Sequence, residues 1–87
     1  MTTKAEKEHL AAVKQLPCVV CRGWPVHVHH IGTGAGGRRD HMKVIPLCER
    51  HHMGEDGIHK IGRRKFAAMY GSEKELLERT QLWLTKQ

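Results

Sequence analysis

The chain has 87 residues, a formal net charge of +6 at pH 7 and three cysteines. This length predicts one domain, residues 1–87, with a core small enough for a bound metal ion to contribute much of the stability. The positive charge favours a polyanionic partner such as nucleic acid, and an ordinary basic domain is the alternative. The polar opening of the chain and the lack of an apolar run of roughly 20 residues argue against a signal peptide and a membrane helix. We therefore expect a cytoplasmic protein without a membrane partner.

Residues 3–16 are predicted to form a helix. Thr3 and Glu6 have the spacing of a capping box, and apolar residues then recur at helical intervals as far as Leu16. Pro17 is expected to end the helix. We expect this helix to pack on the core rather than to carry function.

Two ligand pairs share the i, i+3 spacing that is typical of zinc sites. Cys18 and Cys21 form a predicted knuckle, in which Gly23 is expected to supply a positive φ. Cys48 and His51 repeat the spacing downstream. Three thiolates and one imidazole complete a tetrahedral shell, so the sequence predicts a structural Zn²⁺ site, with buried free thiols as the alternative.

Two short apolar segments, residues 26–30 and 44–47, are predicted to pair as an antiparallel hairpin. Alternate residues of a strand share a face, so His29 and His30 point to opposite faces and should have different roles. His27 shares the face of His29, and we interpret it as a surface residue or a support for a ligand.

A glycine-rich segment, residues 31–40, connects the two predicted strands. It formally contains G-x-G-x-x-G, but the next strand follows too soon for the helix that a dinucleotide site requires. The glycines instead favour close approach of the backbone and of Arg38 and Arg39 to a phosphodiester. A plain connecting loop is the alternative.

After the second strand, the glycines that follow His51 and His52 restrict the next helix to a short segment. Further helices are predicted over 63–70, ending at a glycine cap, and over 73–86, opening with a second capping box. The whole chain is therefore expected to have an α+β fold.

Once the zinc shell is filled, four of the remaining histidines, His29, His30, His52 and His59, are expected to lie near one another: two end the first strand, one begins the short helix and one follows it. In this order the sequence resembles the HNH (ββα-metal) endonuclease superfamily, and within it the phage Ref-type RecA-dependent nucleases. The resemblance covers about residues 8–85. It rests on the motifs Leu16-Pro-Cys-Val-Val-Cys, Val28-His-His-Ile31, Ile45-Pro-Leu-Cys48, His51-His52, Ile58-His59, Tyr70-Gly71 and Glu75-Leu-Leu77.

The resemblance implies a zinc-stapled ββα-metal nuclease core over about residues 16–60, with the N-terminal helix and the two C-terminal helices flanking it. It implies metal-dependent hydrolysis of DNA phosphodiester bonds in phage recombination, with a RecA filament as a further partner. By similarity, His30 is the general base that takes a proton from water. His29, His52 and His59 would hold a catalytic Mg²⁺, Mn²⁺ or Zn²⁺. The DNA backbone would lie against Arg38, Arg39, Lys60, Arg63, Arg64 and Lys65.

The sequence departs from the HNH pattern just before the second strand, where Asp40 and His41 stand in place of the usual asparagine. Either residue could orient His30 or fix the loop, and His41 could equally be an exposed loop residue. Two other functions stay open. One is a non-catalytic basic zinc-ribbon DNA-binding module, in which the extra histidines are incidental or bind a second structural zinc; it does not explain why they fall at the HNH positions. The other is a zinc-stapled protein-interaction adaptor, which leaves both the histidines and the charge unexplained.

Overall fold

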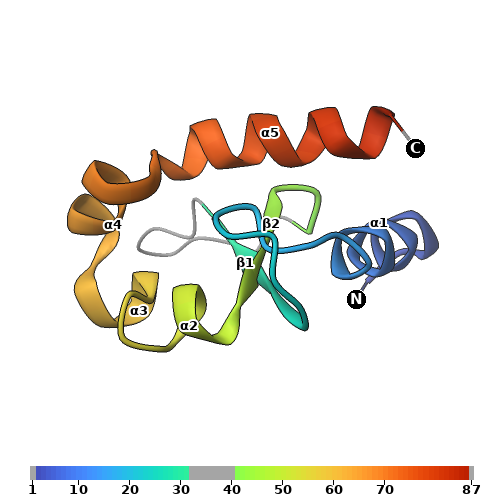
Figure 1. The fold of residues 1–87 in the computed structure, drawn as a ribbon. Helices are drawn as coiled ribbons and strands as arrows, with labels where there is room; N and C mark the ends of the chain where they lie inside the picture. The colour runs from blue at the N-terminus through green and yellow to red at the C-terminus, as the bar shows by residue number, and fades with distance from the viewer. Residues whose placement is uncertain (1, 32–40, 87) are drawn as a thin grey trace.

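A computed structural model describes residues 2–31 and 41–86 of the protein, and it has the expected α+β fold (Figure 1). A two-stranded sheet lies in the middle, with helices around it. None of the helices in these described segments has the length and apolarity needed to cross a lipid bilayer. In chain order the elements are α1 (Lys4–Lys14), β1 (Val26–His30), β2 (Val44–Cys48), α2 (Glu49–His52), α3 (Ile58–Ile61), α4 (Arg63–Tyr70) and α5 (Glu73–Thr85).

The capping box predicted at the start of α1 is confirmed. The Thr3 hydroxyl accepts the Glu6 amide hydrogen at 3.1 Å, and the Glu6 carboxylate accepts the Thr3 amide hydrogen at 2.9 Å. The helix ends at Lys14, earlier than predicted. The reason is a tighter turn, in which the Leu16 amide donates to the carbonyl of Val13 at 3.0 Å.

The predicted hairpin is also confirmed. β1 and β2 are antiparallel, with Val26 opposite Cys48 and Val28 opposite Pro46. Proline cannot donate to a neighbouring strand, but the Pro46 carbonyl accepts the Val19 amide hydrogen at 2.9 Å. This bond attaches the segment between the first two cysteines to β2, close to the third cysteine.

The prediction that Gly23 supplies a positive φ is wrong, because Arg22 is the residue with a positive φ, at 64°. The turn closes one residue earlier than expected: the Arg22 amide donates to the Cys18 carbonyl at 2.8 Å, and the Cys18 amide donates to the Gly23 carbonyl at 2.9 Å. The Arg22 guanidinium also lies 5.9 Å from the centre of the Trp83 ring, which joins this turn to α5.

The core lies between the sheet and the helices that cover it, and its largest fully buried side chains include Phe66 of α4, Leu76 of α5 and Ile45 of β2. Helix α5 runs across the molecule and contacts both β2 and α1 (Figure 1). Helix α4 has the predicted bounds, and α5 begins as predicted and ends at Thr85. The single turn of α3, between Gly57 and Gly62, was not predicted.

Loss of the cap on α5 should destabilise the protein measurably. The Ser72 hydroxyl accepts the Glu75 amide hydrogen at 3.1 Å, and the Glu75 carboxylate accepts the Ser72 amide hydrogen at 3.0 Å. We expect Ser72→Ala to lower the free energy of unfolding by about 1 kcal/mol, measured by urea denaturation in excess zinc. Lys74→Ala, at an exposed position of the same helix, is the control. Equal stability of the two variants would show that the cap contributes nothing.

Candidate metal centres

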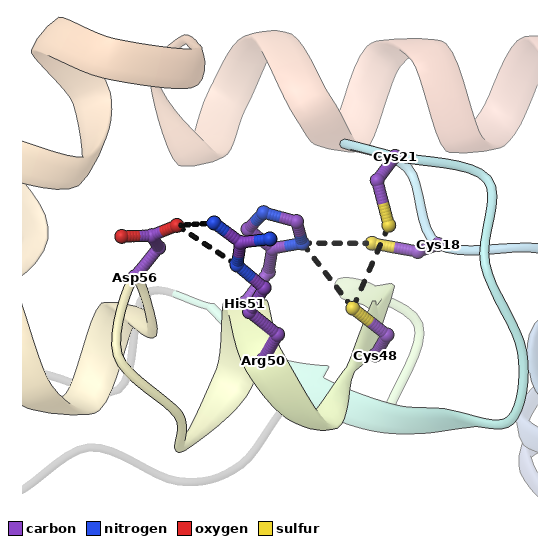
Figure 2. A network of polar contacts seen from close by, with 6 residues as sticks. All are labelled: Cys18, Cys21, Cys48, Arg50, His51 and Asp56. Carbon is purple, nitrogen blue, oxygen red and sulfur yellow. Dashed lines mark hydrogen bonds and ion pairs between the residues drawn. The ribbon is translucent and has the colours of Figure 1, made fainter.

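Four side chains from three segments converge beside the sheet to form the cysteine cluster (Figure 2). Cys18 and Cys21 come from the loop before β1, Cys48 ends β2, and His51 lies in α2. The His51 Nδ1 lies 3.2 Å from the Cys48 sulfur and 3.8 Å from the Cys18 sulfur, and the Cys21 and Cys48 sulfurs are 3.6 Å apart. The four ligand atoms all lie within 4.8 Å of one another.

These distances fit a tetrahedral metal site. Zinc bonds of about 2.3 Å to sulfur and about 2.0 Å to nitrogen place ligand atoms about 3.8 Å apart for two sulfurs and about 3.5 Å apart for sulfur and nitrogen. The observed separations of 3.2 to 3.8 Å are close to these values. The 3.6 Å between the Cys21 and Cys48 sulfurs is also far longer than a disulfide bond of about 2.05 Å, and all three cysteines are free. The cysteine cluster could therefore hold a metal ion.

The pKa shifts within the cysteine cluster differ from one member to the next. Burial alone would raise the pKa of Cys18, but backbone hydrogen bonds from Cys48 and Cys21 outweigh it, and that pKa is lowered. Burial, with contributions from Cys21 and Cys18, raises the pKa of Cys48 to about 11. The pKa of His51 is lowered, first by burial and then by Arg50. A bound cation would stabilise the thiolate forms of the cysteines, and its binding would release protons.

Two contacts hold α2 and its ligand in place. Arg50 binds Asp56 through Nε at 2.9 Å and through Nη2 at 2.7 Å, across the turn that follows α2 (Figure 2). The Tyr70 ring lies edge-on to His51, with ring centres 5.1 Å apart. The first contact braces the turn after α2, and the second packs the Tyr70 ring against the His51 ring.

A second group, the three-histidine cluster, is formed by His29 of β1, His52 of α2 and His59 of α3. One ring nitrogen of each lies within 4.8 Å of the others. His29 is buried, His52 is half-buried and His59 is exposed, so the cluster is accessible to solvent at His59. The single turn of α3 is what places His59 beside the other two rings.

The pKa values keep ligands of this cluster neutral at pH 7. Burial, together with the neighbouring His29 and His59, lowers the pKa of His52 to about 4. Burial also lowers the pKa of His29, although Glu73 opposes the shift. Neutral imidazole is the form that binds metal ions, so these two rings are ready to act as ligands without losing a proton.

Two further residues contact the three-histidine cluster. The sequence predicts no site role for Glu73 and leaves two interpretations open for His27. Glu73, at the start of α5, lies with Oε2 2.9 Å from Nε2 of His29. It was missed because it is 44 residues from His29 and has the ordinary pattern of an acidic residue at a helix start. His27 lies with Nδ1 2.8 Å from Nδ1 of His52, which agrees with its interpretation as a support for a ligand.

His30 lies apart from the three-histidine cluster, as the alternation along β1 predicted. Its Nε2 is 2.9 Å from Nδ1 of His41. Of the two residues expected to orient His30, His41 therefore contacts it, while Asp40 lies outside the described residues. Arg38 and Arg39 lie outside them as well.

Comparison with known families places the chain. Residues 1–83 of the chain match the sequence profile of a family described as "Protein of unknown function (DUF968)". The chain belongs to this family. The DUF968 match includes every residue of the cysteine cluster and the three-histidine cluster. No curated protein matches the chain.

The basic residues proposed to contact DNA differ in their surroundings in this DUF968 protein. Lys60 of α3 and Arg64 and Lys65 of α4 are exposed. Arg63 is exposed as well, but its Nε lies 3.2 Å from Oε1 of Glu73. Arg63 therefore has a partner inside the protein, and the other three side chains are better placed for an external anion.

Proposed function

We propose that this protein is a metal-dependent DNA endonuclease with a zinc-stapled ββα-metal core of the HNH type. The observation that carries the proposal is the three-histidine cluster on the hairpin β1–β2 and the short helices α2 and α3. Its nitrogens offer three ligands, and the exposure of His59 leaves one side accessible to a phosphodiester. In catalytic metal sites the ion typically has three protein ligands and keeps further coordination positions open.

The two clusters would have separate roles. The cysteine cluster supplies four protein ligands and includes the fully buried Cys18, as expected of a structural Zn²⁺ site that joins three segments. The three-histidine cluster would hold a catalytic Mg²⁺, Mn²⁺ or Zn²⁺. When bound, this ion would neutralise the negative charge that develops on the phosphodiester in the transition state.

The remaining chemistry belongs to side chains of the protein. His30 would accept a proton from the attacking water, and the contact with His41 at 2.9 Å would hold its ring in one orientation. The exposed Lys60, Arg64 and Lys65, together with Arg38 and Arg39, would bind backbone phosphates. A role in phage recombination, and dependence on a RecA filament, are part of the proposal by resemblance to the Ref-type nucleases.

Cleavage of supercoiled plasmid tests the proposal. Zinc-loaded protein should convert the plasmid to nicked or linear forms when Mg²⁺, Mn²⁺ or additional Zn²⁺ is supplied, and the same reaction with RecA filaments tests that requirement. His52→Ala should cleave at background rate because it lacks a ligand of the catalytic ion. His9→Ala, a histidine of α1 that belongs to neither cluster, should cleave like the parent. Equal cleavage by parent and His52→Ala would identify a contaminating nuclease and remove the proposal.

The second candidate is a basic zinc-ribbon module that binds DNA without cutting it. The net charge of +6 and the cysteine cluster favour it. In such a module the three-histidine cluster would be incidental or would bind a second structural zinc. DNA binding without cleavage, under every metal condition of the same assay, would select this function.

The salt dependence of DNA binding should locate the phosphate contacts. If Arg38 and Arg39 each contact one phosphate, replacing both by alanine should make the slope of log K against log salt less steep by about 2. Lys4→Ala with Lys7→Ala, on α1 at the side of the molecule away from α3 and α4, removes the same charge and should leave the slope unchanged (Figure 1).

An unchanged slope for the arginine pair would place the DNA elsewhere. The exposed basic residues of α3 and α4 would then be tested as the combined variant Lys60→Ala, Arg64→Ala and Lys65→Ala. Binding affinity over a range of salt concentrations, measured by fluorescence anisotropy, supplies both slopes.

A further inference from the structure

Glu73 makes a contact that links the three-histidine cluster to α5. Its Oε2 lies 2.9 Å from Nε2 of His29, whose side chain is 4% exposed. Its other oxygen, Oε1, lies 3.2 Å from Nε of Arg63. The Glu73 side chain is only 18% exposed, so water competes weakly for either contact. The carboxylate therefore joins a buried histidine of β1 to an arginine of α4.

The chemistry of the two groups sets the direction of the first hydrogen bond. A carboxylate accepts hydrogen bonds and has no proton to donate, so Nε2 of His29 must be the donor. A neutral imidazole carries one ring proton. With that proton on Nε2, the lone pair of His29 is on Nδ1, and Nδ1 is the atom left to bind a metal ion.

Glu73 does not itself belong to the group of converging ligands. Ligand atoms of His29, His52 and His59 lie within 4.8 Å of one another, and the Glu73 carboxylate is not among them. Each of its oxygens instead contacts a side chain at hydrogen-bond or ion-pair distance. This arrangement is that of an outer carboxylate, which orients a ligand rather than binding the ion.

We propose that Glu73 is a positioning residue of the three-histidine cluster, which holds His29 in the Nε2–H tautomer while Arg63 holds the carboxylate. The inference rests on the proposed function, because it assumes that the cluster binds a divalent cation. It also gives Arg63 a role inside the protein in place of contact with DNA. Glu73 thereby makes the geometry of the cluster dependent on the docking of α5.

The first test is the affinity of the cluster for Mn²⁺, measured by titration calorimetry on zinc-loaded protein. Glu73→Ala should weaken Mn²⁺ binding by about 10- to 100-fold, the usual effect of losing an outer partner of a metal ligand. Glu73→Gln keeps an oxygen acceptor for His29 and should retain more of the affinity than Glu73→Ala. Glu78→Ala, exposed on the same helix, removes the same charge and should bind like the parent.

The second test is independent of the second metal. Long-range proton–nitrogen NMR correlations of the histidine rings, recorded on zinc-loaded protein without Mn²⁺, report which ring nitrogen carries the proton. The signals of His29 are identified by their loss in His29→Gln. His29 should be the Nε2–H tautomer in the parent and in Glu78→Ala, and should lose that preference in Glu73→Ala.

The outcomes separate this inference from the proposed function. An Nδ1–H tautomer of His29 in the parent would overturn the inference. If the parent binds Mn²⁺, equal Mn²⁺ affinity of Glu73→Ala and Glu78→Ala would overturn it as well. If the parent shows the Nε2–H tautomer and Glu73→Ala loses it, but the parent binds no Mn²⁺, Mg²⁺ or second Zn²⁺, then Glu73 positions His29 and the catalytic-metal proposal fails. Zinc content and melting temperature, measured for each variant, show that the comparison is between folded proteins.

Discussion

Removal of zinc from the cysteine cluster is expected to unfold or loosen the protein. Structural zinc in small domains contributes about 10–16 kcal/mol of apparent binding free energy at pH 7, whereas a folded domain is typically stable by only about 5–15 kcal/mol. The cluster joins the loop before β1 to the end of β2 and to α2, and Cys18 is fully buried. Without the ion, three thiols and an imidazole in close contact lose the charge that holds them together.

Two measurements on the same samples check this expectation. Elemental analysis should find at least one zinc per chain, and circular dichroism should show loss of the cooperative thermal transition in strong chelator. Cys18→Ser should reproduce the effect of the chelator, because serine cannot supply the thiolate. His52→Ala is the control: His52 lies outside the cysteine cluster, so this variant should keep the zinc bound there. An absence of zinc together with an unchanged melting temperature in chelator would remove the structural site.

Alanine substitution of His30 is expected to abolish most DNA cleavage while metal and DNA binding are retained. Loss of a general base typically lowers the rate by about 10²- to 10⁴-fold. The side chain of His30 contacts His41, whereas its neighbour His29 belongs to the three-histidine cluster. His29→Ala should therefore lose activity together with affinity for the catalytic metal, and should keep the zinc of the cysteine cluster.

The measurement compares cleavage rate, Mn²⁺ affinity and zinc content for the parent, His29→Ala and His30→Ala. His41→Ala should slow cleavage less than His30→Ala, because it removes a contact of the base and not the base itself. His9→Ala should match the parent in all three quantities. Two results would contradict the separate roles of His29 as metal ligand and His30 as general base. One is cleavage by His30→Ala near the parent rate, and the other is equal loss of Mn²⁺ affinity in His29→Ala and His30→Ala.

The elements that rest on local signals were predictable from the sequence. Both capping boxes have a hydroxyl residue three positions before a glutamate, and both form as predicted. The hairpin follows from two short apolar segments, of which the first shows the alternation that separates His29 from His30. The members of the cysteine cluster could be named from the i, i+3 spacing of each pair, because a tetrahedral ion recruits two close pairs of soft ligands.

Contacts between distant segments were decided only by the tertiary structure. The pairing of His29 with Glu73 joins β1 to α5, and its hydrogen bond selects the nitrogen of His29 that is free for a metal. A glutamate at a helix start has the same local pattern whether or not a histidine lies opposite, so no sequence signal marks this one. In the same way, Arg22 rather than Gly23 has a positive φ, because the turn closes through hydrogen bonds on both sides of Cys18. Local spacing thus indicated the ligands of the cysteine cluster, while the packing of α3 and α5 brings His59 and Glu73 to the three-histidine cluster.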